Sequence, residues 1–207
     1  MDDFDVFGAE GAAARLAELI QTARSAAPRF AADDRALLSP PVTPTRDHVD
    51  GVELAESTLL VFGAYGTPWS EPVARLLAGV RQRHLVVWRH FPDPAAHRHA
   101  AMFALAAEAA AAHGRFWALT RELLSMAHDD PADLHGAMLR AGLDPQRTIA
   151  AMQEGAGTQR IVEDVASALA SGVGYVPALF VNGERYTGEL EPAAVTAALA
   201  NGSARRS

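Results

Sequence analysis

Residues 57–91 read STLLVFGAYGTPWSEPVARLLAGVRQRHLVVWRHF, and this stretch decides the fold. Ser57–Gly63 and Leu85–Phe91 are short apolar runs of the kind that form buried parallel strands. Between them, Glu71–Arg83 carries its apolar residues at helical spacing on one face. A strand, a helix and a second strand in this order predict a right-handed β-α-β crossover in a parallel sheet.

The following residues extend this unit. Residues 95–171 are helical in pattern almost throughout, with several interruptions. Pro177–Val181 and Glu184–Thr187 flank Asn182-Gly183, a pair that supplies the two positive φ values of a type I′ hairpin turn. A last helix is predicted over about residues 192–200. This order predicts a thioredoxin-type α/β fold with a helical insertion.

The N-terminal part differs in character. Gly8–Ala27 has the pattern of an amphipathic helix, with Leu16, Leu19 and Ile20 on one side. Leu38–Pro44 is rich in proline, which lacks a backbone donor and fixes φ, so we expect an extended linker there. The predicted organisation is a helix and linker over 1–46, the main domain over 47–200 and a short tail over 201–207. The helix is also a candidate for self-association into a homo-oligomer.

Composition excludes several classes of function. The 207 residues are 49% hydrophobic and 21% charged, which is ordinary for a globular protein. The net charge is −7 and there is no basic block, so we expect no nucleic-acid partner. Every basic residue is an arginine, so Schiff-base chemistry on lysine is excluded. Residues 1–5 are acidic and no long apolar run follows, so we expect a cytoplasmic protein without membrane insertion.

The chain contains no cysteine. It therefore cannot form a disulfide, a mixed disulfide or a thiolate by itself. Any function has to be argued without thiols of its own.

Several separated motifs carry a family resemblance over roughly Asp47–Leu199. They are Phe62–Ser70 at the end of the first strand, Arg89-His90-Phe91-Pro92 after the second, His97-Arg98-His99-Ala100 at a helix start, Gly114-Arg115-Phe116-Trp117 in the insertion, and Gly172–Pro177 continuing to Phe180–Tyr186. In these motifs the chain resembles the DsbA-like branch of the thioredoxin superfamily. Pro40–Val49 also resembles the segment that precedes DsbA-like domains fused behind sodium/proton antiporters.

The resemblance places Thr67-Pro68-Trp69-Ser70 where the family has Cys-Pro-x-Cys. One interpretation is helix capping, in which Thr67 or Ser70 accepts from a first-turn amide and Pro68 favours the first turn. The other is that the hydroxyls hold the thiolate of a bound ligand at the positive end of the helix. Kappa-class glutathione transferases, which resemble DsbA in fold, carry Ser-Pro-Tyr-Ser in this place. Glutathione is therefore the ligand that the second interpretation implies.

The resemblance also implies that Val176-Pro177 is a cis-proline loop facing the motif. Such a loop exposes the backbone of Val176 to an extended peptide or to glutathione. Tyr65 and Trp69 are candidates either for the apolar floor of a ligand site or for packing into the domain. His97 and His99 do not face each other at this spacing on a helix, so we expect no metal site from them.

The leading hypothesis is a DsbA-like domain without redox cysteines that binds an extended peptide or protein segment. Its candidate site residues are Tyr65, Thr67, Pro68, Trp69, Ser70, Val176 and Pro177, none of them with a certain catalytic role. The alternative is a glutathione-dependent transferase or isomerase in which Thr67 or Ser70 orients the thiolate. A third is a purely structural domain in which the N-terminal helix covers the motif surface or mediates self-association. The residues thus exclude a disulfide oxidoreductase and leave other enzymatic activity open.

Overall fold

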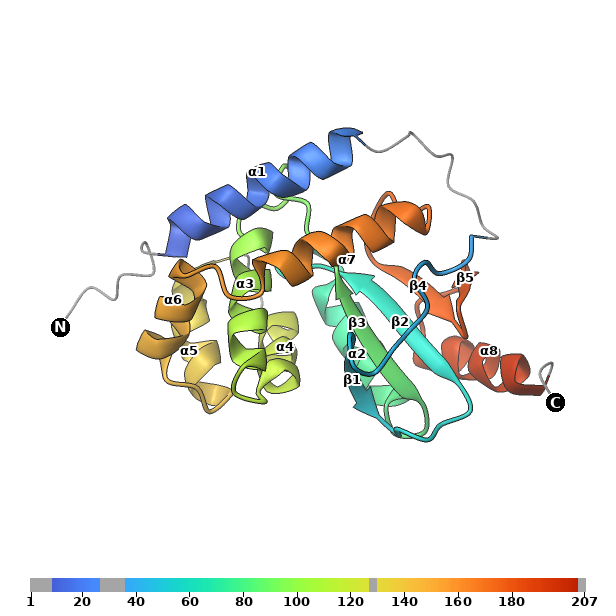
Figure 1. Ribbon diagram of the computed structural model, residues 1–207. Coiled ribbons are helices and arrows are strands. Elements are labelled where there is room, and N and C mark those ends of the chain that lie inside the picture. The colour runs from blue at the N-terminus through green and yellow to red at the C-terminus, as the bar shows by residue number, and fades with distance from the viewer. Residues whose placement is uncertain (1–8, 27–35, 127–129, 205–207) are drawn as a thin grey trace.

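The computed structural model describes residues 9–26, 36–126 and 130–204. In these residues a five-stranded sheet has the order β1-β3-β2-β4-β5, and helices cover its faces and extend to one side (Figure 1). The strands are β1 (His48–Gly51), β2 (Thr58–Gly63), β3 (Leu85–His90), β4 (Ala178–Val181) and β5 (Glu184–Tyr186). The thioredoxin-type α/β architecture predicted from the sequence is confirmed.

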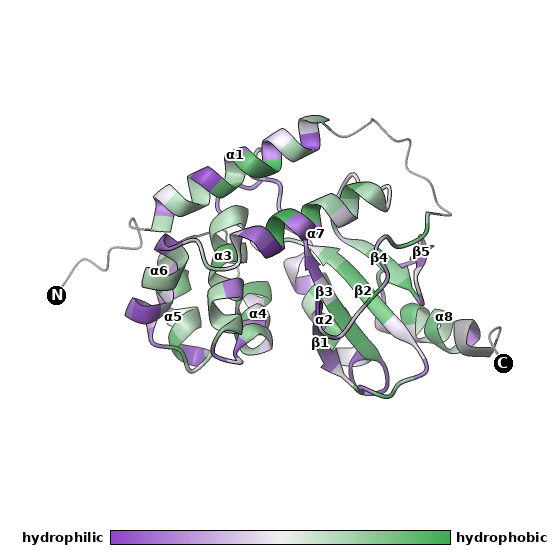
Figure 2. Cartoon of the chain, viewed as in Figure 1, coloured by the Kyte–Doolittle hydropathy of each residue, from purple (hydrophilic) through white to green (hydrophobic). Residues whose placement is uncertain are grey.

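The predicted crossover forms the centre of the sheet. Strands β2 and β3 pair in parallel, from Thr58 opposite Leu85 to Gly63 opposite His90, and helix α2 (Ser70–Val80) connects them. β3 is buried throughout and β2 almost so, which explains the apolar runs in both strands, green in Figure 2. β3 ends in two polar residues, Arg89 and His90, which are also buried. Gly63 has to be glycine because a Cβ would lie 2.2 Å from the Trp88 ring.

The two sheet edges differ in how well the sequence predicts them. The hairpin β4–β5 is confirmed, since Asn182 and Gly183 adopt φ values of 54° and 88°. Strand β1 was not predicted, and it pairs antiparallel with β3. Its sequence, His-Val-Asp-Gly, is too short and too polar to show a period.

The helical insertion packs beside the sheet. It consists of α3 (Ala100–Ala111), α4 (Phe116–Ser125), α5 (Ala132–Arg140), α6 (Pro145–Gln153) and α7 (Thr158–Ala170). Helix α7 contacts β3, whereas α8 (Pro192–Ala204) packs against α2 and β4. Helix α3 is the centre of the insertion, because residues 100–110 are all buried.

The N-terminal helix α1 (Glu10–Ala26) is confirmed in position. Ala12, Leu16 and Ile20 are buried, while Leu19 is 48% exposed. The prediction that Leu19 shares the apolar face was therefore wrong. The buried stripe packs against α3, α6 and α7 of the same chain, and in Figure 1 α1 lies across these helices. The apolar face proposed for self-association is thus used within the chain.

The described part of the expected linker, residues 36–46, is joined to the domain. Leu37 forms a β-bridge with Glu184, and the Leu38 amide donates to the Gly183 carbonyl at 2.9 Å. Leu38 is buried, and the Ser39 amide donates to the Ser171 hydroxyl at 2.9 Å. The expected extended segment is thus bonded to the domain, because the domain supplies partners for its backbone groups.

A fully buried arginine completes this attachment. Nε and Nη2 of Arg89 donate to the Asp47 carboxylate, at 2.8 and 2.9 Å. Nη1 and Nη2 donate to the carbonyls of Pro40 and Pro41, at 2.8 and 3.1 Å. The fifth bond, from Nη1, reaches the Ser167 hydroxyl at 2.8 Å. All five guanidinium donors are satisfied, so Arg89 joins β3, α7 and the proline-rich segment.

Burial acts to raise the pKa of Asp47, but hydrogen bonds from Arg89 and Thr43 and the charges of Arg89 and Arg46 outweigh it and lower the pKa. Asp47 is therefore ionised at neutral pH, and its contact with Arg89 is a buried ion pair. Within the described residues, no helix has the length and apolar character needed to cross a membrane.

Candidate functional site

The segment between β2 and α2 holds the four motif residues. Ser70 begins α2 and is buried, whereas Thr67 is partly exposed and Trp69 is half-exposed. The Thr67 amide donates to the Ser70 hydroxyl at 3.1 Å, and the Trp69 amide donates to the Thr67 hydroxyl at 3.2 Å. Both hydroxyls thus accept from backbone amides inside the motif, but neither accepts from an amide of the first turn of α2, which the capping interpretation expects. The turn that leads into α2 is closed by these contacts.

Tyr65 does not form the floor of a ligand site, contrary to one of the two interpretations of its role. It is fully buried, its ring stacks on Trp88 at 5.1 Å between centroids, and its hydroxyl bonds the Thr120 hydroxyl at 3.0 Å. Burial raises the pKa of Tyr65 well above its ordinary value. Tyr65 is therefore a neutral core residue.

A groove of about 290 Å³ lies beside the motif. The peptide bond between Val176 and Pro177 is cis, and both residues line the groove with Trp69 and Tyr175. The remaining lining comes from β4, β5 and the loop that follows: Ala178, Leu179, Arg185, Tyr186, Thr187, Gly188 and Leu190. Trp69 and Tyr175 are 50% and 61% exposed, so two aromatic side chains are available to a ligand at this surface.

The lining of this groove does not include Thr67 or Ser70. The glutathione hypothesis needs an open cleft that joins these hydroxyls to Val176, and the groove joins only Trp69 to that loop. The structural hypothesis needs the motif surface to be covered, for instance by α1, but α1 packs on α3, α6 and α7. The concave part of the site is therefore the aromatic groove at Val176-Pro177.

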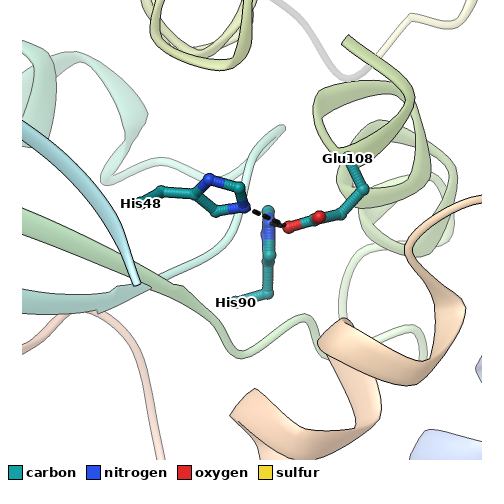
Figure 3. A group of neighbouring side chains, drawn as sticks. All are labelled: His48, His90 and Glu108. Atoms are coloured by element: carbon teal, nitrogen blue, oxygen red, sulfur yellow. Dashed lines mark hydrogen bonds and ion pairs between the residues drawn. The ribbon is translucent and has the colours of Figure 1, made fainter. Parts of the chain in front are cut away.

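A second group of functional side chains lies where β1, β3 and α3 meet, and sequence reasoning missed it. His48, His90 and Glu108 converge in Figure 3, one from each element. Nε2 of His48 and Nε2 of His90 lie 2.8 and 2.9 Å from the same carboxylate oxygen, Oε1 of Glu108. His90 and Glu108 are buried, and 18% of the His48 side chain is exposed.

The two histidines keep Glu108 ionised. Burial acts to raise the pKa of Glu108, but hydrogen bonds and charge interactions with His48 and His90 outweigh it and lower the pKa to about 2. Gly157, at the start of α7, permits this placement, because a Cβ there would lie 2.1 Å from Cβ of Glu108. The two histidines therefore stabilise the buried Glu108 carboxylate, and Gly157 leaves room for its side chain.

Aromatic rings fix the two imidazoles. The His48 ring stacks on Phe116 with centroids 3.6 Å apart, and the His90 ring makes edge contacts with Tyr65, Trp88 and Phe116. The indole Nε1 of Trp88 donates to Nδ1 of His90 at 3.3 Å. Since an indole nitrogen only donates, Nδ1 of His90 accepts, and its Nε2 carries the proton that is donated to Glu108.

One signal for this group is visible in the sequence. Glu108 is the single acidic residue in the otherwise apolar helix Ala100–Ala111, and a buried acid needs a partner. His48 and His90 both lie in the motifs that carry the family resemblance. No spacing rule joins them, however, because the three residues come from three elements. His97 and His99, the pair considered from the sequence, lie just before α3 and outside this group.

Comparison with known proteins agrees with the fold. A model of the DSBA-like thioredoxin domain matches residues 81–200. BdbD of Bacillus subtilis superposes with a TM-score of 0.69 at 13% identity, covering 83% of this chain and all of that one. A thioredoxin-like oxidoreductase of Silicibacter pomeroyi gives 0.67 at 22% identity, covering 80% and 95%.

Curated relatives are longer than this chain. A Na(+)/H(+) antiporter NhaA 3 of Salinispora tropica is 38% identical over 89% of this chain, and a Na(+)/H(+) antiporter NhaA of Herminiimonas arsenicoxydans is 36% identical over 81%. The chain spans only 29% and 27% of these two proteins. Because the domain model covers more than half of the chain and the fold agrees with it, the chain belongs to the family of DsbA-like thioredoxin domains.

Proposed function

We propose that this domain binds an extended peptide or protein segment at the groove beside Val176-Pro177, without redox chemistry of its own. The observation that carries the proposal is the pair of exposed aromatic side chains, Trp69 and Tyr175, on a groove of about 290 Å³ in a chain that has no cysteine. Exposed aromatic residues around a concave surface are typical of binding sites.

The surroundings of the groove suit an extended chain. Residues of β4 and β5 line the groove. The backbone of a bound segment would therefore lie beside strand backbone, and extended peptides are commonly bound in this way. Arg185 also lines the groove, and its guanidinium lies over the Tyr175 ring at 5.6 Å from the centroid. A cation at this place favours a segment that carries an acidic side chain next to apolar ones.

The test uses an unfolded probe without free thiols, reduced and carboxymethylated ribonuclease, titrated with the full chain and followed by fluorescence anisotropy. We expect saturable binding that Trp69→Ala and Tyr175→Ala each weaken several-fold. Leu54→Ala is the matched control, because Leu54 is 95% exposed and does not line the groove. Absence of binding, or equal binding by all variants, would contradict the proposal.

Reduced glutathione is titrated in parallel by calorimetry with Thr67→Ala and Ser70→Ala variants. Saturable glutathione binding that these variants weaken, without binding of the unfolded probe, would support the transferase hypothesis instead. Binding of the probe alone, dependent on Trp69, would leave the peptide-binding function in place.

A further inference from the structure

Two imidazole nitrogens and one carboxylate oxygen converge where β1, β3 and α3 meet. His48, His90 and Glu108 each offer one ligand atom, and these three atoms all lie within 4.8 Å of one another. Two histidines and one glutamate form a donor set that zinc accepts in proteins, with a fourth position left for water or substrate. Imidazole-rich sites of this kind also suit other divalent transition metals.

The distances between the three ligand atoms are those of hydrogen bonds and are shorter than a bound metal ion needs. The two nitrogen to oxygen distances are 2.8 and 2.9 Å. A tetrahedral ion with bonds of about 2.0–2.1 Å would separate its ligand atoms by roughly 3.3 Å. The two nitrogen to oxygen distances therefore need to lengthen by only about half an ångström, and the Phe116 ring packs on both imidazoles.

The charge of the group favours a cation. Oε1 of Glu108 lies 2.8 and 2.9 Å from Nε2 of His48 and Nε2 of His90, and the Glu108 side chain is buried. A buried carboxylate is costly unless its charge is compensated. A divalent ion would provide that compensation.

We propose that His48, His90 and Glu108 bind a divalent transition-metal ion, with zinc as the representative case, and that Trp88 limits its affinity. When Nε2 of His90 binds the ion, the ring proton has to move to Nδ1, where it meets the indole N–H of Trp88 at 3.3 Å. A histidine ligand normally donates its second nitrogen to an acceptor. In this chain the Nδ1–H of His90 and the indole N–H of Trp88 would face each other. This contact should weaken metal binding without preventing it.

The test is a calorimetric titration of the full, untagged and EDTA-treated chain with zinc chloride. We expect one ion per chain, and a loss of affinity of roughly tenfold or more in His48→Ala and in Glu108→Gln. The double variant His97→Ala/His99→Ala is the matched control, because these histidines lie outside the group. Cobalt(II) should give the intense visible absorption of a four-coordinate ion in the control and not in Glu108→Gln.

Trp88→Phe separates this proposal from surface binding and from misfolding. Removing the indole donor should tighten zinc binding, whereas general damage to the core would weaken it. Absence of saturable heat, binding that persists in His48→Ala and Glu108→Gln, or weaker binding in a folded Trp88→Phe variant would each overturn the proposal. Circular dichroism of each variant establishes that it is folded.

Discussion

Replacing Arg89 with methionine should lower the free energy of unfolding by about 3–5 kcal/mol, the usual cost of breaking a buried ion pair by removing one partner. The side chain of Arg89 and that of Asp47 are both fully buried. The substitution also removes the five hydrogen bonds of the guanidinium. At roughly 1.5–3 kcal/mol for each bond to a charged group, their gross sum exceeds the first figure, and release of the desolvation cost of a buried arginine offsets part of it.

The assay is urea unfolding followed by circular dichroism, together with thermal unfolding. For a chain of this length, a loss of about 4 kcal/mol corresponds to a fall in Tm of roughly 8–16 °C. Arg75→Met is the matched control, since the Arg75 side chain is 58% exposed and pairs with an exposed Glu71. Such a surface pair contributes less than about 1 kcal/mol.

The reciprocal variant sharpens the argument. Asp47→Ala should cost at least as much as Arg89→Met, because arginine cannot lose its charge by deprotonation, whereas a stranded aspartate can take up a proton. In addition, Asp47 that has lost Arg89 keeps contacts with Arg46 and Arg160. A loss of under about 1 kcal/mol in Arg89→Met, or a milder effect in Asp47→Ala, would refute the view that this pair attaches residues 36–46 to the domain.

Three further predictions concern other parts of the chain. Leu16→Ala should lower the free energy of unfolding, measured by chemical denaturation, by about 2–5 kcal/mol, because Leu16 of α1 is buried against the insertion. Leu19→Ala should lower it much less, because Leu19 is half-exposed. Burial, and to a smaller extent Arg83, lowers the pKa of His84 below 6.5, so the unfolded chain binds the proton more readily and stability should fall as the pH drops below about 6.5. Urea unfolding at neutral and acidic pH should show a smaller fall in His84→Asn. Thr67→Cys/Ser70→Cys should gain thiol-disulfide exchange in an insulin-reduction assay, because Ser70 begins α2 and Thr67 lies in the turn just before it. Thr67→Cys alone is the inactive control, and no activity in the folded double variant would mean that this turn and helix no longer support the exchange.

The sequence predicts the centre of this fold well because burial leaves a local pattern. β2, α2 and β3 appear as apolar runs and a helical face, and the Asn182-Gly183 turn has a specific backbone requirement. Strand β1 escapes prediction because its pairing with β3, more than thirty residues away in the chain, provides what its own sequence lacks. Propensity is a weak guide where partners are distant.

Residues 36–46 and the His48, His90 and Glu108 group were missed for a related reason. The carbonyls of Pro40 and Pro41 are satisfied by Arg89, nearly fifty residues further on. Glu108 meets His48 across sixty residues. A polar group that is compensated by a distant partner looks, in the sequence, like a polar group on the surface. The exposure of Trp69 and the burial of Tyr65 were left open for the same reason, since either aromatic residue suits either place.

The two candidate sites share one structural element, the carboxyl end of the parallel pair. β2 leads through Gly63 into Tyr65 and the motif, while β3 ends at His90. Tyr65 stacks on Trp88 and makes an edge contact with His90 at 5.8 Å between centroids. The hydroxyl of Tyr65 is held by Thr120 of α4, so its ring is fixed from both sides. Close-packed interiors transmit small displacements. A change at His90 that moves Trp88 should therefore also move Tyr65, which lies two residues before Thr67. The chain has no cysteine, and this arrangement of sheet end, aromatic residues and buried histidines needs none, so both proposed binding sites are independent of thiol chemistry.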